Sequence, residues 1–377
     1  MKLQGLRVVD LSSFLPGPYL TMTLADHGAE VIKIEPPGEG DPGRHIGSSD
    51  GPTTVFFRNF NRGKKSVVLD LKVPEQRERL LDLCDTADVF VETFRPGVAD
   101  RLGLSYEALS VRNPRLVYCS ISAFGQGPYR HRPAHDLALE AISGTLSMTL
   151  GNDDKPVIPA IPIADQLSAL QGLSAVLMAL LRRETTGRGD YIDIAMHDAM
   201  LAACANIVGP VMAEGRQPVA KHERSTGGAA FYQIYETRDA RHIVLGGQEE
   251  KFVRNLLNAL ACPDLIPLCL RGPGPHQRPV IEFLKATFGG MSADEAVTFL
   301  SGFDVCFGPV NTLPEAFEDE NAKARGMILR DEAGRRHIAP VIRFRDEPPA
   351  PSLDAPALGE NTQDVLNRVS RPKPDAA

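Results

Sequence analysis

The sequence predicts an α/β fold built on a doubly wound parallel sheet, and three observations support this. The chain has 377 residues, more than one small domain needs, so two or three domains are expected. From residue 6 to residue 121, short apolar strands alternate with amphipathic helices through short connections, as in a sheet with helices on both faces. From residue 226 onward, an alternating strand pair and several helices predict a second, smaller α+β domain.

The strands of the large domain are expected at residues 6–11, 30–35, 66–71, 88–93 and 116–121, with one more after the glycine-rich turn at 187–189. Gly28 ends the first helix, because glycine commonly follows helices where the backbone turns left-handed. A further helix is expected from Asp136 to Leu150, and a long apolar helix from Ile163 to Leu181.

Composition and charge exclude several classes of protein. Hydrophobic residues make up 43% and charged residues 24% of the chain, which is typical of a globular enzyme, and the net charge of −7 argues against nucleic-acid binding. The N-terminus lacks the apolar run of a signal peptide, and no uninterrupted stretch has the roughly 18 apolar residues of a membrane span. The six cysteines form no CxxC pair, so we expect buried free thiols in a reducing cytoplasm, and no metal site.

The first strand–loop–helix unit raises the question of a dinucleotide site. Its loop reads SSFLPGP and lacks the G-x-G-x-x-G pattern, so it has no glycines that let the backbone approach a pyrophosphate closely. We therefore expect the sheet topology without a nicotinamide cofactor.

Three residues are candidates for catalysis. His135 and Asp165 follow successive elements, and the arginines and glycines before His135 suit an anionic or carbonyl-bearing ligand. Asp165 begins an apolar helix, so it either caps that helix or acts as a partly buried acid or base. His135 is either structural or a proton-transfer group, and Glu249, taken alone, is an acid that caps a helix.

Two further groups have competing interpretations. Arg62, Lys64 and Lys65 precede the strand at 66–71, where they either grip phosphates or line a solvated edge. His197 and Asp198 form a second His–Asp pair, but they fall inside a predicted helix and are interpreted as packing and capping residues.

Long motifs along nearly the whole chain resemble the class III CoA-transferase family, also called CaiB/BaiF, which includes the α-methylacyl-CoA racemases. The motifs occur in the family's order and read GLRVVDLSSFLPGPYLTMTLADHGAEVIKIEPPGEGD, NRGKKSVVLDLK, ADVFVETFRPGVADRLGLSYEAL, NPRLVYCSISAFGQGPY, TGRGDYIDIAMHDAML, FGPVNTLPEAF and LGENTQDVL. The resemblance implies a Rossmann-like large domain made from residues 1–205 and 326–377, and a small domain at 226–325. It also implies ring-shaped subunits that interlock as a homodimer. The last residues, RPKPDAA, are expected to be frayed.

The family binds coenzyme A as part of its acyl-CoA substrate, on the large domain, and holds no other cofactor tightly. The positions that match its CoA-binding residues are Phe14, Leu15, Arg62, Lys64, Lys65, Thr93, Phe94 and Arg101. Pro36 departs from the family, many of whose members have arginine there, and Arg44 is the expected substitute.

Asp165 matches the residue that is the nucleophile in the transferases and a catalytic acid or base in the racemases. Racemases add a histidine and a glutamate, and His135 and Glu249 lie at the matching intervals. The segment HDLALEA nevertheless departs from HDINY, which is typical of racemases.

Three hypotheses follow. The main one is a racemase that inverts the α-carbon of a 2-methyl-branched acyl-CoA, with Asp165 on one side of the carbon and His135, oriented by Glu249, on the other. The alternative is a transferase in which Asp165 carries CoA between an acyl-CoA and a carboxylic acid. The third is a CoA-binding protein without turnover. The sequence predicts neither the acyl group nor the acceptor acid, although Phe231, Tyr232 and Gln248 are expected to shape the acyl pocket.

Overall fold

The computed structural model describes residues 1–369, and the chain divides into two compact units. The first unit comprises residues 1–142, 160–201 and the described residues from 320 onward, and the second comprises residues 143–159 and 202–319. Each unit has its own hydrophobic core. The C-terminal segment RPKPDAA lies outside the described residues.

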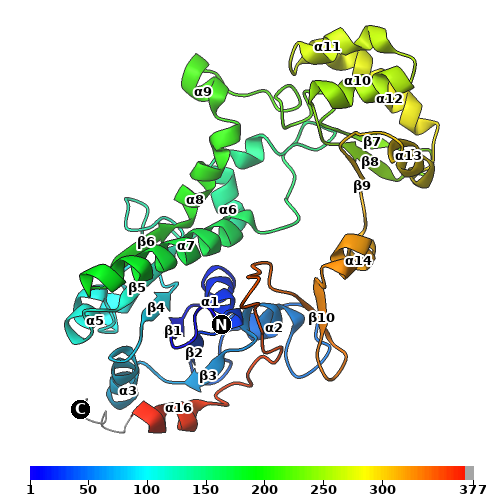
Figure 1. Cartoon of the computed structure of the whole chain (residues 1–377). Coiled ribbons are helices and arrows are strands. Elements are labelled where there is room, and N and C mark those ends of the chain that lie inside the picture. The colour runs from blue at the N-terminus through cyan, green and yellow to red at the C-terminus, as the bar shows by residue number, and fades with distance from the viewer. Residues whose placement is uncertain (370–377) are drawn as a thin grey trace. The chain divides into compact units, whose positions relative to one another are not determined.

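A six-stranded parallel sheet forms the centre of the first unit (Figure 1). The strands in spatial order are β3 (Lys65–Val68), β2 (Glu30–Glu35), β1 (Arg7–Leu11), β4 (Val89–Glu92), β5 (Val117–Ser122) and β6 (Tyr191–Ala195). All five neighbouring pairs are parallel, with Val8 opposite both Val31 and Val89. The predicted α/β class with a parallel sheet is therefore confirmed.

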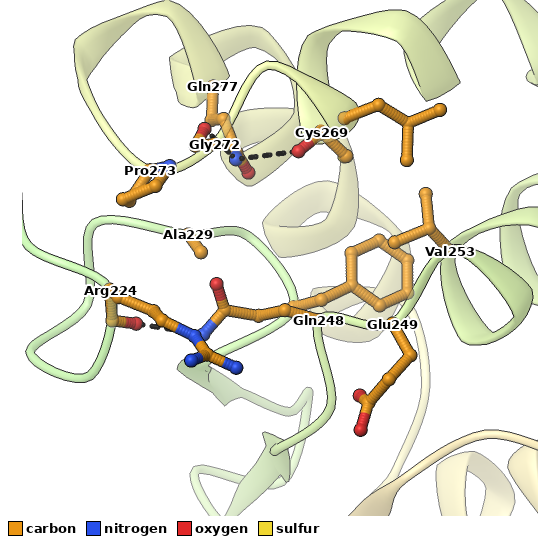
Figure 2. A pocket seen from close by; sticks show the side chains of 11 residues that line it. Arg224, Ala229, Gln248, Glu249, Val253, Cys269, Gly272, Pro273 and Gln277 are labelled. Atoms are coloured by element: carbon orange, nitrogen blue, oxygen red, sulfur yellow. Dashed lines mark hydrogen bonds between the residues drawn. The ribbon is translucent and has the colours of Figure 1, made fainter.

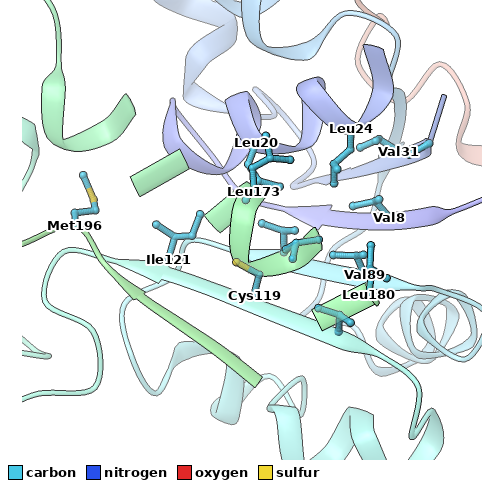
Figure 3. Packing of buried hydrophobic residues seen from close by; sticks show 14 of the residues in the cluster. Val8, Leu20, Leu24, Val31, Val89, Cys119, Ile121, Leu173, Leu180 and Met196 are labelled. Atoms are coloured by element: carbon cyan, nitrogen blue, oxygen red, sulfur yellow. The ribbon is translucent and has the colours of Figure 1, made fainter. Parts of the chain in front are cut away.

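Helices α1 (Pro16–Asp26) and α7 (Ile163–Thr186) cover one face of this sheet. Leu20 of α1 and Leu173 of α7 pack there on the branched side chains of the strands, as Figure 3 shows for Val8 and its neighbours. Because successive strand residues face opposite sides, Val8 enters this core and Val9 enters the other one.

The opposite face is covered by α3 (Pro74–Cys84), α5 (Tyr106–Arg112) and α16 (Thr362–Val369). Phe90 and Tyr118 lie at the centre of this second core and are fully buried or nearly so. Burial on both faces explains why the strands read as continuous apolar runs in the sequence.

The remaining elements of the first unit are short. They are α2 (Val55–Asn61), α4 (Val98–Arg101), α6 (Asp136–Ile142), α8 (Met196–Ala203), α15 (Glu320–Ala324), β10 (Ile328–Arg330) and β11 (Arg336–Ile338). Helix α6 ends eight residues before the predicted Leu150. The reason is Gly144, whose φ of 88° turns the chain out of the helix and into a 3₁₀ turn at Thr145–Ser147.

The second unit contains a small antiparallel sheet with strand order β7 (Gln233–Glu236), β8 (His242–Leu245) and β9 (Phe307–Pro309). Its helices are α9 (Gly209–Glu214), α10 (Glu250–Ala259), α11 (Ile266–Leu270), α12 (Arg278–Gly289), α13 (Ala293–Leu300) and α14 (Leu313–Glu318). Helices α10, α12 and α13 pack their apolar faces against Tyr235 and Leu245.

Helix α7 is the one helix within residues 1–369 that is long and apolar enough to cross a membrane. Its residues Ala164, Leu173, Val176 and Leu180 are buried in the sheet core. Their packing is that of a core helix, which passes the same test of length and composition.

Arg62 joins three segments of the first unit that are far apart in sequence. Its guanidinium donates to both carboxylate oxygens of Asp26 at the end of α1, at 3.0 and 2.6 Å, and to the carbonyl of Ile338 in β11 at 2.6 Å. The side chains of Arg62 and Asp26 are only 2% and 4% exposed. This buried bidentate pair therefore anchors the C-terminal part of the chain to the first helix.

Replacing Arg62 with glutamine should destabilise the first unit strongly. The carboxylate of Asp26 would remain buried without its counter-charge, a loss of about 3–5 kcal/mol in the free energy of unfolding. Urea unfolding followed by circular dichroism measures this loss. The matched control is Arg368→Gln, which breaks the exposed pair between Arg368 and Asp364 in α16 and should cost about 0.5 kcal/mol or less. Equal losses in the two variants would contradict a structural role for Arg62.

Candidate active site

The loop from β1 to α1 is held by buried charges. Asp10, near the end of β1, accepts hydrogen bonds from the backbone N–H of Ser12 at 2.9 Å and from the Thr21 hydroxyl at 2.7 Å. Lys64 donates to Asp10 at 3.0 Å, and both side chains are fully buried. Burial tends to raise the pKa of Asp10, but Lys64 and Lys33 outweigh it and hold the pKa well below its usual range.

A second buried pair continues this network on the neighbouring strand. Lys33 of β2 lies 2.7 Å from the carboxylate of Asp41 and donates to the carbonyl of Ser12 at 2.8 Å. Asp41 accepts in turn from the backbone N–H of Phe14 at 3.3 Å. Phe14 has a φ of 63°, a left-handed conformation that is rare for a bulky residue, and its ring is 41% exposed. The charges thus fix a loop that presents Phe14 to solvent.

The end of β4 lies beside this loop, because β1 and β4 are neighbours in the sheet. Thr93 accepts the backbone N–H of Ser13 at 3.0 Å, and the N–H of Phe94 donates to Glu92 at 2.6 Å. The strand order reverses at β1 and β4, which is where α/β sheets bind ligands. Phe14, Thr93 and Phe94 therefore lie at the expected ligand crevice, and Leu15, which is 5% exposed, begins α1 beneath it.

The cations predicted to bind phosphate differ in their exposure and in whether they already have an ion-pair partner within the chain. Arg62 and Lys64 are buried and paired with internal carboxylates, so neither charge is free to meet a phosphate. Lys65 is 30% exposed and pairs with Glu30. Arg101, at the end of α4, is exposed and forms no ion pair within residues 1–369. The competing interpretation of a solvated edge is wrong for Arg62 and Lys64, since both are buried.

Arg44, the expected substitute for an arginine at Pro36, has a structural partner. Its guanidinium donates to both oxygens of Glu35, at 2.7 and 2.6 Å, and stacks 3.9 Å from the ring centre of Phe57. Its charge is therefore already neutralised, while Pro36 is exposed.

Asp136 directly follows His135 in the chain and contacts the backbone of Asp165. The Asp136 carboxylate accepts the backbone N–H of Asp165 at 3.1 Å, which ties the start of α6 to the first turn of α7. His135 directly precedes Asp136, is exposed, and lies edge-on to Phe14 with ring centres 5.9 Å apart. His135 thus lies beside the loop that carries Phe14, and the residue after it holds the backbone of Asp165.

Asp165 does not cap α7, contrary to one interpretation of the sequence. It is the third residue of the helix, after the N-cap Pro162, and the capping acceptors come from α6. Asp136 accepts from Asp165, and Glu140 accepts the N–H of Ile163 at 3.4 Å. The carboxylate of Asp165 is therefore not used to cap its own helix.

Burial raises the pKa of Asp165 to about 7, and the nearby charge of Asp136 adds to this shift. A helix N-terminus favours the ionised carboxylate, so burial and the like charge outweigh the helix dipole here. A carboxyl group with a pKa near neutrality is half ionised at pH 7 and can act as a base, an acid or a nucleophile.

Replacing Asp165 with asparagine should stabilise the protein more at pH 8 than at pH 5. Because the folded state holds the Asp165 proton more tightly than the unfolded chain, stability is lost as the pH rises from about 4 to about 7, and the asparagine variant escapes this loss. Melting temperatures of both proteins at the two pH values measure the effect. Asp198→Asn is the control, because the Asp198 side chain is 80% exposed. A gain that does not grow with pH would contradict the raised pKa.

Glu249 belongs to the second unit. It occupies the N-cap position of α10, but its side chain makes no capping hydrogen bond and is exposed. It lines a cavity of about 330 Å³ together with Arg224, Phe231, Gln248 and Gln277 (Figure 2). Gln277 lies across the cavity from Arg224 and Glu249 and is fixed by hydrogen bonds to the carbonyls of Gly272 and Cys269. Of the three residues expected to shape the acyl pocket, Phe231 and Gln248 line this cavity, whereas Tyr232 is not among its lining residues.

The second His–Asp pair and the cysteines form no site. His197 and Asp198 begin α8, with their side chains 3.6 Å apart. The six cysteines form no disulfide bond within residues 1–369. Cys84, Cys119 and Cys204 are buried, Cys262 and Cys269 are half-buried, and Cys306 is exposed, contrary to expectation. Within residues 1–369 no group of three His, Cys, Asp or Glu side chains could hold a metal ion.

The sequence interpretation missed two features of this region. It did not predict that Asp136 joins α6 to α7, and it did not consider Glu140. Their spacing of four residues on one predicted helix, shortly before a second helix that begins with Asp165, was the available signal.

Comparison with known proteins identifies the family. A family model described as CoA-transferase family III matches residues 3–362. The acetyl-CoA:oxalate CoA-transferase of Acetobacter aceti is 38% identical over 378 residues, which cover 98% of this chain and 96% of that protein. The succinyl-CoA:glutarate CoA-transferase of Mus musculus is 30% identical over 381 residues, which cover 98% of this chain and 86% of that protein. The crystal structure of a CaiB/BaiF family protein from Brucella suis superposes with a TM-score of 0.85 at 31% identity and covers 98% of this chain and 99% of that chain.

These findings confirm the family inferred from the motifs. They also favour the transferase alternative over the racemase hypothesis, because the two relatives named above are CoA-transferases and the match covers 86% and 96% of their length. The chain belongs to CoA-transferase family III.

Proposed function

We propose that this protein is a CoA-transferase that moves CoA from an acyl-CoA to a carboxylic acid through a covalent intermediate on Asp165. The observation that carries the proposal is the state of this carboxyl group: it is partly buried in the first turn of α7, free of capping duty, and has a pKa of about 7. A more basic carboxylate is a stronger nucleophile, and full-length relatives that are named CoA-transferases support the same chemistry.

The reaction proceeds in balanced steps. The ionised oxygen of Asp165 attacks the carbonyl carbon of the donor thioester, the C–S bond breaks, and an acyl-aspartyl anhydride and the CoA thiolate form. The thiolate attacks the Asp165 carbonyl carbon of the anhydride, which releases the donor acid and leaves an aspartyl-CoA thioester. The acceptor carboxylate then repeats both steps in reverse, so that Asp165 is restored and a new acyl-CoA leaves.

The surrounding groups position these steps. Each attack places negative charge on a carbonyl oxygen, and the positive end of the α7 helix dipole would help to stabilise that charge. CoA is expected along the carboxyl ends of β1 and β4 beside Phe14, Thr93 and Phe94, with the exposed Arg101 available to its phosphates. Lys65 pairs with Glu30 where β3 and β2 begin, at the other end of these strands. CoA is a substrate in this scheme and not a resident cofactor.

A second candidate function, racemisation at the α-carbon of an acyl-CoA, is favoured by one observation. His135 has an exposed imidazole and directly precedes Asp136, which accepts the backbone N–H of Asp165. Proton transfer would use Asp165 and His135 on the two sides of the carbon.

Incubation with acetyl-CoA or succinyl-CoA alone should leave a CoA adduct on Asp165. The reason is that the aspartyl-CoA thioester accumulates when no acceptor acid is present to discharge it. Intact-mass measurement detects the adduct, and peptide mapping places it on the residue. Asp165→Asn should form no adduct, and addition of oxalate or glutarate, the acceptors named for relatives, should discharge it.

The same incubation distinguishes the racemase. A 2-methylacyl-CoA that takes up deuterium at its α-carbon from heavy water, with no CoA adduct under any condition, would overturn the transferase proposal. His135→Ala should abolish such exchange while it affects CoA transfer much less.

We also propose that the protein works as an interlocked homodimer, as its resemblance to the family implies. In the single chain, α7 leaves an apolar stripe in water, formed by Leu170, Leu177, Met178 and Leu181, and Leu181 is 75% exposed. These residues follow helical spacing, so they form one face opposite the sheet core. Apolar faces of this kind mark surfaces that another protein covers.

Protein expressed with glutamate at both Met178 and Leu181 should fail to assemble into dimers, because the charges would be buried in the interface at high cost. Light scattering coupled to gel filtration measures the mass. Lys285→Glu, an exposed charge change in α12, is the control and should remain a dimer. A wild-type protein that runs as a monomer, or a double variant that stays dimeric, would contradict this assembly.

A further inference from the structure

Two carboxyl groups of α6 face the first turn of α7. Asp136 and Glu140 are four residues apart and therefore lie on one side of the helix. Asp136 accepts the backbone N–H of Asp165 at 3.1 Å, and Glu140 accepts that of Ile163 at 3.4 Å. Together they provide acceptors for the first backbone donors of α7, which the N-cap Pro162 leaves without a side-chain partner.

Because they hold backbone N–H groups two residues apart on α7, the two carboxyl groups lie close enough together for one to hydrogen-bond to the other. A hydrogen bond between two carboxyl groups requires a proton, because two carboxylates offer only acceptors. The residue better suited to hold this proton is Glu140, which is only 1% exposed. Burial raises its pKa first, and the hydrogen bond to Asp136 and the charge of Asp136 raise it further.

We propose that Asp136 and Glu140 form a proton-sharing pair, with the proton on Glu140, and that this pair positions the nucleophile Asp165 and limits the negative charge beside it to one. The inference rests on the proposed function of Asp165 and adds two positioning residues to it. Glu140 donates its O–H to Asp136, and Asp136 uses its remaining capacity to hold the N–H of Asp165.

The charge of Asp136 is the interaction that adds to burial in making Asp165 basic. Titratable groups on other elements packed against α7 have other partners. Asp26 of α1 pairs with Arg62, and Asp193 of β6 accepts the N–H of Gln126. His135, next to Asp136, is exposed, and Cys119 of β5 is buried in the sheet core. The single charge of the pair thus adjusts the basicity of Asp165 while the shared proton prevents a second charge.

The pH dependence of adduct formation tests the charge. In the wild type, the rate of CoA adduct formation should rise with pH through about 7, where Asp165 ionises. Asp136→Asn keeps an acceptor for the Asp165 N–H but removes the charge, so this rise should move to lower pH by about one unit. An unmoved profile in a folded Asp136→Asn protein would overturn the proposal.

Two substitutions at Glu140 test the proton. Glutamine keeps a donor for Asp136 and an acceptor for Ile163, whereas leucine provides neither. Glu140→Leu should slow adduct formation about tenfold or more, since buried acceptors and donors lose their partners, and Glu140→Gln should recover the rate to within about threefold of the wild type. If glutamine is as slow as leucine, Glu140 acts as a carboxylate and the pair does not share a proton.

Infrared difference spectra provide an independent readout. At pH 8, the wild type minus Glu140→Gln spectrum should contain the C=O stretch of a protonated carboxyl group, and its absence would overturn the proposal. Failure of the proposed function gives a different result, because a wild type that forms no adduct at any pH refutes the nucleophile itself, while the infrared band still reports the pair.

Discussion

The loop that carries the expected CoA site depends on one buried electrostatic network. Asp10, Lys33, Asp41 and Lys64 are taken almost completely out of water, and such charges are tolerated only when each has a close partner. The four come from β1, β2, the excursion after β2 and the entry to β3, and the register places Asp10 opposite Lys33 and Lys33 opposite Ser66, so their pairing joins three neighbouring strands and the loop after β2. The apolar core builds the sheet, but the charges determine the shape of the loop that presents Phe14.

Buried carboxyl groups with close partners also determine the structure at the start of α7. The helix dipole and burial act in opposite directions on Asp165, and the sequence could not decide between them. The structure decides for burial, because Asp136 and Glu140 take the backbone donors and a like charge lies next to Asp165. A residue freed from capping in this way is less stable as a carboxylate and more reactive, which is a common exchange of stability for activity.

Periodicity predicted the sheet and its helices because each strand and helix must bury an apolar face. The apolar pattern that reveals this face lies within the element's own residues. The motifs likewise made Asp165 and His135 candidates for catalysis. The partners of Arg62 and Lys64 could not be predicted, since a cation before a strand reads the same whether it meets solvent or a buried carboxylate. Arg62 contacts Ile338, far along the chain, and no local pattern records such a pair. The predicted helix at 136–150 is too long because the sequence does not show that Gly144 adopts a left-handed conformation. Glycine also occurs inside helices, so its presence alone does not mark the helix end.

The choice between transferase and racemase depends on what each mechanism requires of the chain. Inversion at carbon needs two proton-transfer groups on opposite sides of one atom, and the intervals between His135, Asp165 and Glu249 in the sequence carry no information about sides. Transfer of CoA needs one carboxylate that can form and release an acyl bond. The first unit provides that group by itself, with its pKa already near 7, whereas the racemase mechanism as proposed here also needs Glu249 from the second unit. The residues recognised as racemase-like are thus compatible with both reactions, and the simpler requirement is the one that the geometry of the first unit already meets.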